Sequence, residues 1–217
     1  MVSKGRRKYP QSRSLKRRSP QRQPKIQIIV VCEGMKTEPH YLRCFKSHHS
    51  SYLVDLVLVE DAGSPMTIVD EAIVQKKELE RRARKSKNSF EGEFEVWGMF
   101  DIDEHPNIPQ AKDKAFGNNI PLAISNPCFE LWVYLHYCDH NAWTHRHDMQ
   151  KLLKIKMNNY DPSHRKQIDY EEIKDHFDCA RSKAMRLIKN RKNEADEGGN
   201  PSTNVFELLD VIIENGK

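Results

Sequence analysis

The sequence predicts an α/β protein, with a mainly parallel β-sheet flanked by helices and a helical portion at its C-terminal end. Two observations favour this class. Residues 26–32, IQIIVVC, form a nearly continuous run of apolar, mostly β-branched side chains, which is typical of a strand buried on both faces of a sheet. Strand-like and helix-like segments then alternate as far as Tyr137, as expected of right-handed βαβ units.

The first 25 residues differ in composition from the rest of the chain. Ten of the 36 Lys and Arg in this 217-residue chain lie there, together with three Pro and no Asp or Glu. The formal net charge of +5 therefore comes from this segment. Because such a segment buries too little apolar surface to fold, we expect residues 1–25 to be a disordered basic arm. It would either bind nucleic-acid phosphates by counterion release or serve as a solvated leader.

A turn and a helix are expected directly after the first strand, over EGMKTEPHYLRCFK. Gly34 suits a sharp turn, and Thr37 is a candidate N-cap. Pro39 lies in the first helical turn, where proline is favoured. The apolar side chains that follow recur at helical spacing: Tyr41, Leu42 and Phe45.

Further strands and helices follow this unit as far as Tyr137. Ser64 is a candidate N-cap, and Pro65 would occupy the first position of its helix. NPCFELWVYLHY predicts another helix, with Ser125 or Asn126 as its cap and Pro127 at its first position. We expect, in order, a strand over 52–59, a helix over 62–85, a strand over 95–100, a helix over 109–119 and a strand over 120–125.

The strand signals cease after Tyr137. Helical patterns cover residues 147–157, 169–192 and 203–215. The sequence therefore predicts three parts: the basic arm over 1–25, an α/β core over 26–137, and a helical portion over 138–217 packed on that core.

Composition and missing motifs exclude several classes of protein. The five Cys are odd in number and form no C-x-x-C pair, so we expect reduced thiols in a cytoplasmic protein. No apolar run reaches the roughly 18 residues of a membrane helix, so no membrane association is expected. No P-loop and no serine nucleophile elbow is present. The His and Cys of HYCDHNAWTHRHD match no common zinc module in their spacing.

Acidic residues lie where two predicted strands end. Glu33 follows the first strand, and Asp101 and Asp103 follow the third, spaced so that both lie on one side of an extended segment. Ligands of open α/β sheets bind at the carboxyl ends of the strands, so these carboxylates converge if the two strands are neighbours. A bound Mg²⁺ or Mn²⁺ would neutralise the cluster and suit phosphodiester chemistry. The alternative is that acidic residues end strands because they are soluble and begin turns.

Motifs spread over residues 26–214 resemble the RloB-like family in order and spacing: VVCEGMKTEPHYLRCFK, FDIDE, ISNPCFELWVYLHY and GGNPSTNVFELLDVI. Members of that family are found beside restriction loci and among abortive-infection proteins of phage defence. The resemblance implies a Toprim-like fold, with Glu33 as the glutamate after the first strand and Asp101 and Asp103 as the D-x-D pair that binds Mg²⁺. It also implies a partner NTPase encoded at the same locus.

Two further carboxylates have alternative roles. Where many Toprim proteins have a short loop, Glu38 lies at a helix start; it is either an additional site residue or a favourable charge at a helix N-terminus. Glu130 either lies beside the acidic cluster or closes a capping box. His136 lies on an apolar helical face and is expected to be a hydrogen-bonded core histidine.

Candidate nucleic-acid contacts come from basic and hydroxyl side chains. In GGNPSTN, turn-forming glycines precede Ser202 and Thr203, which would begin a helix; this segment is either a phosphate site or an ordinary N-cap. Lys36 lies three residues after Glu33, which follows the first predicted strand. Lys183 and Arg186 lie on a predicted helix whose basic face either contacts nucleic acid or is only solvated.

These features together favour a Mg²⁺-dependent nuclease, acting on RNA, tRNA in particular, or on DNA, as an effector of anti-phage defence. Glu33 would be a metal ligand or general base, Asp101 and Asp103 metal ligands, and Glu130 a supporting carboxylate. The alternative is a non-catalytic regulator that binds nucleic acid or a partner through its basic arm.

Overall fold

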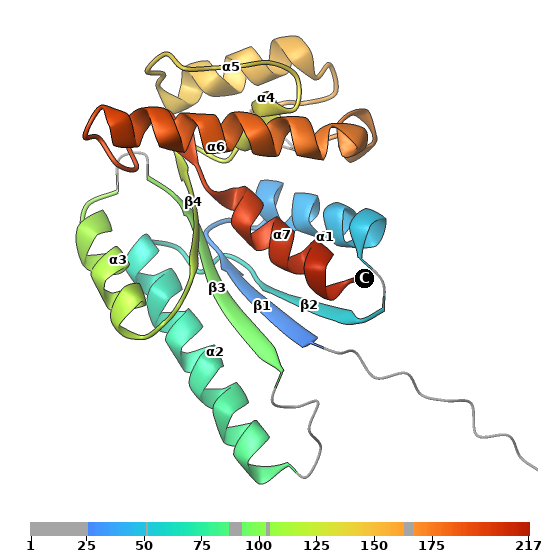
Figure 1. Cartoon of the computed structure of the whole chain (residues 1–217), viewed down its shortest axis with the longest axis vertical. Coiled ribbons are helices and arrows are strands. Elements are labelled where there is room, and N and C mark those ends of the chain that lie inside the picture. Colours follow the sequence, from blue (N-terminus) through green and yellow to red (C-terminus); the bar gives the residue numbers. More distant parts are fainter. Residues whose placement is uncertain (1–25, 51, 87–92, 103–104, 163–166) are drawn as a thin grey trace, which may run out of the picture.

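The computed structural model describes residues 26–50, 52–86, 93–102, 105–162 and 167–217. The predicted basic arm lies outside the described residues. A five-stranded sheet with helices on both faces forms the centre of the molecule (Figure 1). The elements, in chain order, are β1 (Ile26–Cys32), α1 (Thr37–His49), β2 (Val54–Val59), α2 (Pro65–Lys85), β3 (Phe94–Asp101), α3 (Ile108–Gly117), β4 (Leu122–Asn126), α4 (Glu130–Leu135), α5 (Arg146–Lys156), η2 (Tyr170–Glu172), η3 (Lys174–His176), α6 (Phe177–Asn193), β5 (Ser202–Thr203) and α7 (Val205–Asn215).

The sheet has the strand order β2-β1-β3-β4-β5. The first four strands of this order run parallel, and β5 pairs antiparallel with β4. This arrangement confirms the predicted α/β class with a mainly parallel sheet. It also confirms that β1 and β3 are neighbours, the condition on which convergence of the acidic strand ends depended.

Both faces of β1 are buried, as its apolar run predicts. Alternate side chains enter two separate cores because successive residues of a strand point to opposite faces. Ile29 and Val31 pack in the core that α2 and α3 cover. Ile28 and Val30 pack in the larger core, to which α1, α4, α6 and α7 contribute. Helices α4, α5 and α6 gather at the carboxyl end of β3 (Figure 1).

The two predicted caps of the early helices differ in outcome. Ser64 caps α2 as predicted: its Oγ accepts a hydrogen bond from the N–H of Thr67 at 3.4 Å, and Pro65 is the first helical residue. Thr37 is not a cap, which corrects the prediction. It is the first residue of α1, and Lys36 occupies the cap position without a capping hydrogen bond from its side chain.

The polar residues before α4 do not cap it either. Asn126 is the last residue of β4, and α4 begins only at Glu130. Ser125 Oγ lies 3.0 Å from Thr203 Oγ1, and Asn126 Nδ2 donates to the carbonyl oxygen of Gly198 at 3.0 Å. These side chains join β4 to the C-terminal segment, so they are not available as helix caps.

The C-terminal portion is mainly helical, as predicted, through α5, α6 and α7. The predicted helix start at Ser202 and Thr203 is wrong. Ser202 and Thr203 form β5 instead of a helix start, a strand too short to show a periodic pattern. The side chain of Asn204 extends this contact with β4. Its Oδ1 accepts from the N–H of Ile124 at 2.7 Å, and its Nδ2 donates to the carbonyl oxygen of Leu122 at 2.9 Å.

The predicted helix over 169–192 is divided. It begins with the short 3₁₀ turns η2 and η3, and α6 starts only at Phe177. Tyr170 and Ile173, three residues apart, are both buried in the larger core, which the threefold repeat of a 3₁₀ turn allows. Among the described residues, no helix combines the length and the apolar character needed to span a membrane.

Candidate functional site

Two acidic residues meet where β1 and β3 end. Cys32, the last residue of β1, pairs with Met99 of β3, and the N–H of Glu33 donates to the carbonyl oxygen of Met99 at 3.1 Å. Asp101 ends β3, and its own N–H donates to Glu33 Oε2 at 3.0 Å. The structure therefore brings Glu33 and Asp101 together. Asp103, the third predicted carboxylate, lies outside the described residues.

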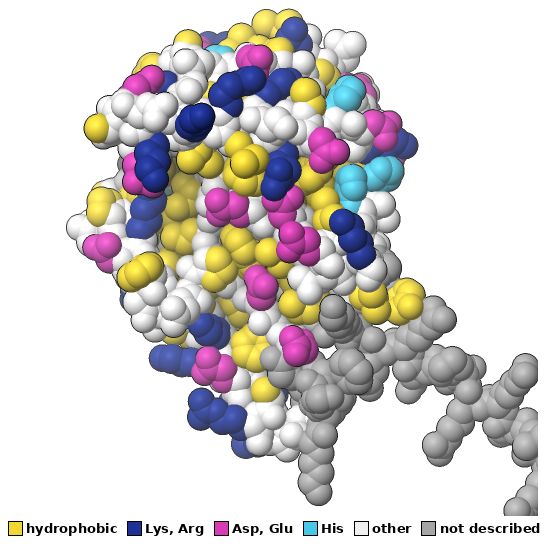
Figure 2. All heavy atoms as spheres, viewed as in Figure 1, with side chains coloured by type: hydrophobic (Ala, Val, Ile, Leu, Met, Phe, Trp, Pro, Cys, Tyr) yellow, Lys and Arg dark blue, Asp and Glu magenta, His cyan; other side chains and the backbone are white. Residues whose placement is uncertain are grey.

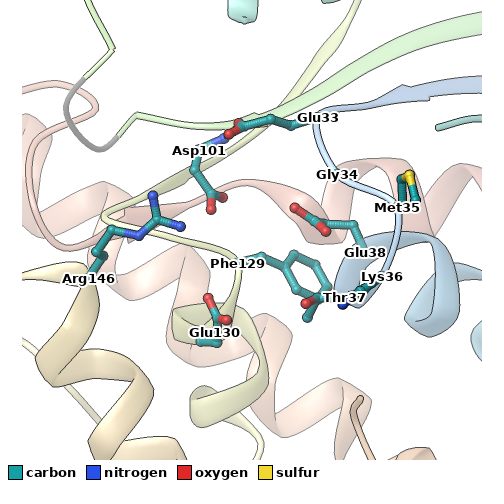
Figure 3. Close-up of a pocket in the computed structure, with 10 residues that line it drawn as sticks. All are labelled: Glu33, Gly34, Met35, Lys36, Thr37, Glu38, Asp101, Phe129, Glu130 and Arg146. Carbon is teal, nitrogen blue, oxygen red and sulfur yellow. The ribbon is translucent and has the colours of Figure 1, made fainter. Parts of the chain in front are cut away.

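A cavity of about 410 Å³ opens at these strand ends (Figure 3). Four carboxylates contribute to its wall, from β3 and from the segments that follow β1 and β4, and Lys36 and Arg146 also line it. Figure 3 shows the Arg146 guanidinium and the Glu38 carboxylate both pointing toward the carboxyl group of Asp101. The full lining consists of Glu33, Gly34, Met35, Lys36, Thr37, Glu38, Asp101, Phe129, Glu130 and Arg146.

Asp101 is the most strongly perturbed of these carboxylates. Only 7% of its surface is exposed. Burial, followed by the charges of Glu38, Glu130 and Glu33, raises its pKa well above the usual range, whereas Arg146 acts in the opposite direction. A carboxyl group in this environment gains stability by binding a proton or a cation.

Glu33 is oriented by contacts to both of its carboxylate oxygens. Oε2 accepts from the backbone of Asp101, and Oε1 lies 3.1 Å from Nε2 of His105. Each carboxylate oxygen has two lone pairs, so both oxygens can still bind a cation. His105 was not expected at the site, although it directly follows the acidic motif FDIDE.

Glu130 is a buried member of the site and not a capping residue. It is only 3% exposed, and it lines the cavity from the first turn of α4. Its Oε1 accepts hydrogen bonds from the hydroxyl of Tyr160 at 2.5 Å and from Nε2 of Gln150 at 3.2 Å. Burial and the nearby Glu130 charge raise the pKa of Tyr160, so its hydroxyl keeps the proton that it donates.

Glu38 and Lys36 lie together at the start of α1. Glu38 lines the cavity and also lies in the first turn of that helix, so both alternatives from the sequence are compatible with its position. Lys36, a candidate nucleic-acid contact, lies in the same wall. Arg146 was not recognised from the sequence because no motif connects it to the acidic strand ends; only tertiary packing brings α5 to them.

The other candidate nucleic-acid residues lie outside this cavity. Lys183 donates to the carbonyl oxygen of Leu135 at 2.8 Å, and Arg186 pairs with Asp139. Figure 2 shows basic side chains gathered over α6 beside acidic ones over α7, and Arg181 of α6 pairs with Asp210 of α7 at 2.8 Å. Much of this basic face is therefore engaged with groups of the same chain.

Ser202 and Thr203 are buried in β5, with 7% and 1% of their surfaces exposed. The phosphate-site interpretation relied on free backbone N–H groups at a helix start. The structure places a strand there instead, because the hydroxyl of Thr203 contacts Ser125 of β4 and Asn204 bonds to the backbone of that strand. The geometry behind that interpretation is therefore not present at these two residues.

The donor set of the cavity suits a hard divalent cation. Its acidic ligands are carboxylate oxygens, and Mg²⁺ usually needs only one or two of them when water and substrate phosphates complete its shell. Among the described residues, which leave out Asp103, no group of three or more His, Cys, Asp and Glu side chains could hold a metal ion. Carboxylate oxygens of Glu33, Glu38, Asp101 and Glu130 are the cation-binding groups that line the cavity.

Comparison with known proteins identifies a family. The family model described as RloB-like protein matches residues 28–212, which include the carboxyl ends of both strands that meet at the cavity. No curated protein and no solved structure matches the chain.

Proposed function

Since this chain belongs to the RloB-like protein family, we propose that it is a metal-dependent nuclease that cleaves phosphodiester bonds as an effector of anti-phage defence. The observation that carries this proposal is the convergence of Glu33, Glu38, Asp101 and Glu130 on one cavity beside the guanidinium of Arg146. Carboxylates for a divalent cation and a positively charged side chain for phosphate oxygens suit metal-assisted phosphodiester cleavage.

Asp101 and Glu33 would bind the magnesium ion, together with Asp103. When bound, the ion supplies Lewis-acid activation of the phosphoryl group and a more acidic water. Glu33 is fixed for either of its proposed roles, metal ligand or general base, because the Asp101 backbone and His105 contact its two oxygens. Arg146 can bind two phosphate oxygens at once through its planar guanidinium.

Glu130 serves in this proposal as the supporting carboxylate. Its Oε1 already accepts two hydrogen bonds from Tyr160 and Gln150, so its position is fixed before substrate binds. A group fixed in advance does not need to reorganise during the reaction. By analogy with toxins that halt growth, RNA, tRNA in particular, is the preferred substrate over DNA in this proposal. A partner NTPase from the same locus, which the family resemblance implies, would supply the trigger.

The proposal is tested by incubating purified protein with labelled RNA or DNA in the presence of Mg²⁺ or Mn²⁺. We expect metal-dependent strand cleavage, which Asp101→Asn and Glu33→Gln each lower by about 100-fold or more. The matched control is Asp113→Asn, an exposed acidic residue of α3 outside the cavity, which should cleave as the wild type does. Wild-type rates in Asp101→Asn, or full phage protection by a cleavage-deficient variant in cells, would contradict the proposal.

A non-catalytic regulator is the alternative, and a different change separates it from the nuclease. If the basic arm provides the contacts, deletion of residues 1–24 lowers nucleic-acid affinity and flattens its dependence on salt. Substitutions in the cavity would then leave phage protection intact. If the protein is a nuclease, substitutions in the cavity should instead abolish phage protection.

A further inference from the structure

Trp143 is a large aromatic side chain that the fold leaves in solvent. It is 71% exposed, whereas Trp97 and Trp132 are 5% and 0% exposed. Single exposed apolar residues are common on protein surfaces, so exposure alone does not assign a role. The surroundings of Trp143 add two further observations.

The backbone next to Trp143 is fixed by tertiary hydrogen bonds. The N–H of Thr144 donates to Oδ1 of Asn200 at 3.2 Å, and Nδ2 of Asn200 donates back to the carbonyl oxygen of Thr144 at 2.9 Å. The Thr144 hydroxyl donates to the carbonyl oxygen of Ala142 at 3.0 Å, on the other side of the tryptophan. The indole ring is therefore presented from an ordered loop, which lowers the entropy cost of a contact with it.

The same contacts place Trp143 at the cavity end of the sheet. Asn200 lies just before β5, and Ser202 of β5 pairs with Asn126, the last residue of β4. The Thr144–Asn200 contact therefore lies at the carboxyl end of β4, next to the end of β3. Arg146, three residues after Trp143, lines the cavity and points toward Asp101 (Figure 3). Three residues of chain span at most about 11 Å between Cα atoms, so the backbone that carries the exposed ring is close in space to the backbone of a cavity-lining residue.

We propose that this end of the molecule binds a single-stranded segment of nucleic acid, with a phosphate on Arg146 and an unpaired base stacked on Trp143. This inference deepens the proposed function and rests on it, since it uses the same cavity. A guanidinium binds phosphate oxygens in a planar, two-point geometry. An exposed aromatic ring binds bases of any sequence through their flat faces.

Stacking on Trp143 would select single-stranded over double-stranded nucleic acid. In a duplex, neighbouring base pairs cover the faces of each base, so a ring on the protein surface has no base to stack on. In a single-stranded loop or end the bases are free to leave their neighbours. Arg146 and Lys36 reduce the repulsion between the backbone phosphates and the four carboxylates of the cavity.

The experiment uses the intrinsic fluorescence of Trp143, because the other two tryptophans are buried. The full-length protein is titrated in EDTA, which prevents cleavage, with an RNA of about 12 nucleotides, the DNA of the same sequence, and the RNA duplex. We expect both single strands to quench the exposed tryptophan and the duplex to leave it unchanged. Trp143→Phe should remove the quenching, which assigns the signal to this residue and separates it from binding by the arm.

Affinity is measured independently by anisotropy of the labelled single strand. Trp143→Ala should weaken binding roughly 5- to 100-fold, Trp143→Phe should retain most of the affinity, and Arg146→Ala should weaken binding and lower the salt dependence. The matched control is Phe116→Ala: Phe116 is 87% exposed near the end of α3, just before the amino end of β4, at the opposite end of the sheet. It should bind as the wild type does.

Unchanged affinity in Trp143→Ala, or equal quenching by the duplex, overturns the inference. Quenching by single strands without cleavage in metal would contradict the nuclease and leave the stacking contact in place. Cleavage with normal affinity in Trp143→Ala would leave the nuclease in place and contradict the contact.

Discussion

The backbone N–H of Asp101 donates a hydrogen bond to Oε2 of Glu33 at 3.0 Å, across 68 residues of sequence. This contact connects the ends of the neighbouring strands β1 and β3. It turns the Glu33 carboxylate toward β3 and leaves the carboxyl group of Asp101 pointing into the cavity with Glu38 (Figure 3). The electrostatic properties of the site follow from this geometry, because buried like charges accumulate around Asp101.

Divalent metal should stabilise the wild-type protein and not Asp101→Asn. A cation that binds only the folded state at about 100 times its Kd adds about 2.7 kcal/mol to the free energy of unfolding. For a chain of this size we expect an increase in Tm of roughly 5–10 °C with Mn²⁺ or Mg²⁺.

Without metal, Asp101→Asn should melt at or above the wild-type temperature because it removes like-charge repulsion. Scanning calorimetry with and without EDTA measures both effects; an equal metal shift in wild type and variant contradicts the site, and Asp113→Asn should shift as the wild type does.

Tyr160→Phe should lower cleavage through Glu130. The substitution removes the hydroxyl that donates to Glu130 Oε1, whereas the hydrogen bond from Gln150 to the same oxygen stays. We expect about a 10-fold loss of kcat with little change in KM, and a loss of about 1–3 kcal/mol in unfolding free energy.

The control is Tyr137→Phe. It removes a hydroxyl that donates a hydrogen bond to Glu172 at 3.0 Å, at the surface of the protein. It should affect neither quantity by more than a small fraction. Equal kcat in Tyr160→Phe and wild type would show that Glu130 needs no orientation by this hydroxyl.

Asn204→Ala should destabilise the edge of the sheet. The side chain accepts from the N–H of Ile124 and donates to the carbonyl oxygen of Leu122, so its loss leaves two β4 backbone groups without these partners. Chemical denaturation should show a loss of about 2 kcal/mol. Asn215→Ala, which removes one contact within the last turn of α7, is the control and should cost less than about 0.5 kcal/mol. Equal losses in the two variants would contradict the assigned role of Asn204.

The stability of the protein should fall below about pH 6.5 through His136. Its Nδ1 donates to the carbonyl oxygen of Trp132 at 3.0 Å, and Nε2 lies 3.4 Å from the hydroxyl of Tyr41. Burial lowers its pKa to about 4 in the folded state, whereas the unfolded value is near 6.5. Between these values the unfolded chain binds a proton that the folded chain does not, so the free energy of unfolding decreases as pH falls, by about 3 kcal/mol in total.

Chemical denaturation at several pH values measures this contribution. In His136→Gln, whose amide can replace both hydrogen bonds, the decrease between pH 6.5 and 4 should be smaller by that amount. Above pH 6.5 the histidine is neutral in both states, so the two proteins should show the same pH dependence there. If the free energy of unfolding fell as steeply with pH in the variant as in the wild type between pH 6.5 and 4, the prediction would be contradicted.

The local pattern of the chain determined most of the fold and part of the site. The apolar run before Glu33 marks a strand buried on both faces, and the Ser64–Pro65 pair marks the start of α2, because each signal is contained within a few neighbouring residues. Acidic residues at the ends of β1 and β3 indicated where a site would form, since parallel strands bring their carboxyl ends to one edge.

Tertiary structure alone decided which other side chains meet there. Tyr160 and Gln150 contact Glu130, and Arg146 faces Asp101. These three residues lie in α5 or just after it, in a segment whose sequence pattern does not connect it to the acidic strand ends. β5 was missed for a related reason: two residues have no period, and they form a strand only because β4 provides pairing partners. The spacing of apolar residues along the sequence indicates which face each helix or strand buries. The contacts that complete this cavity depend instead on how separate elements pack against one another.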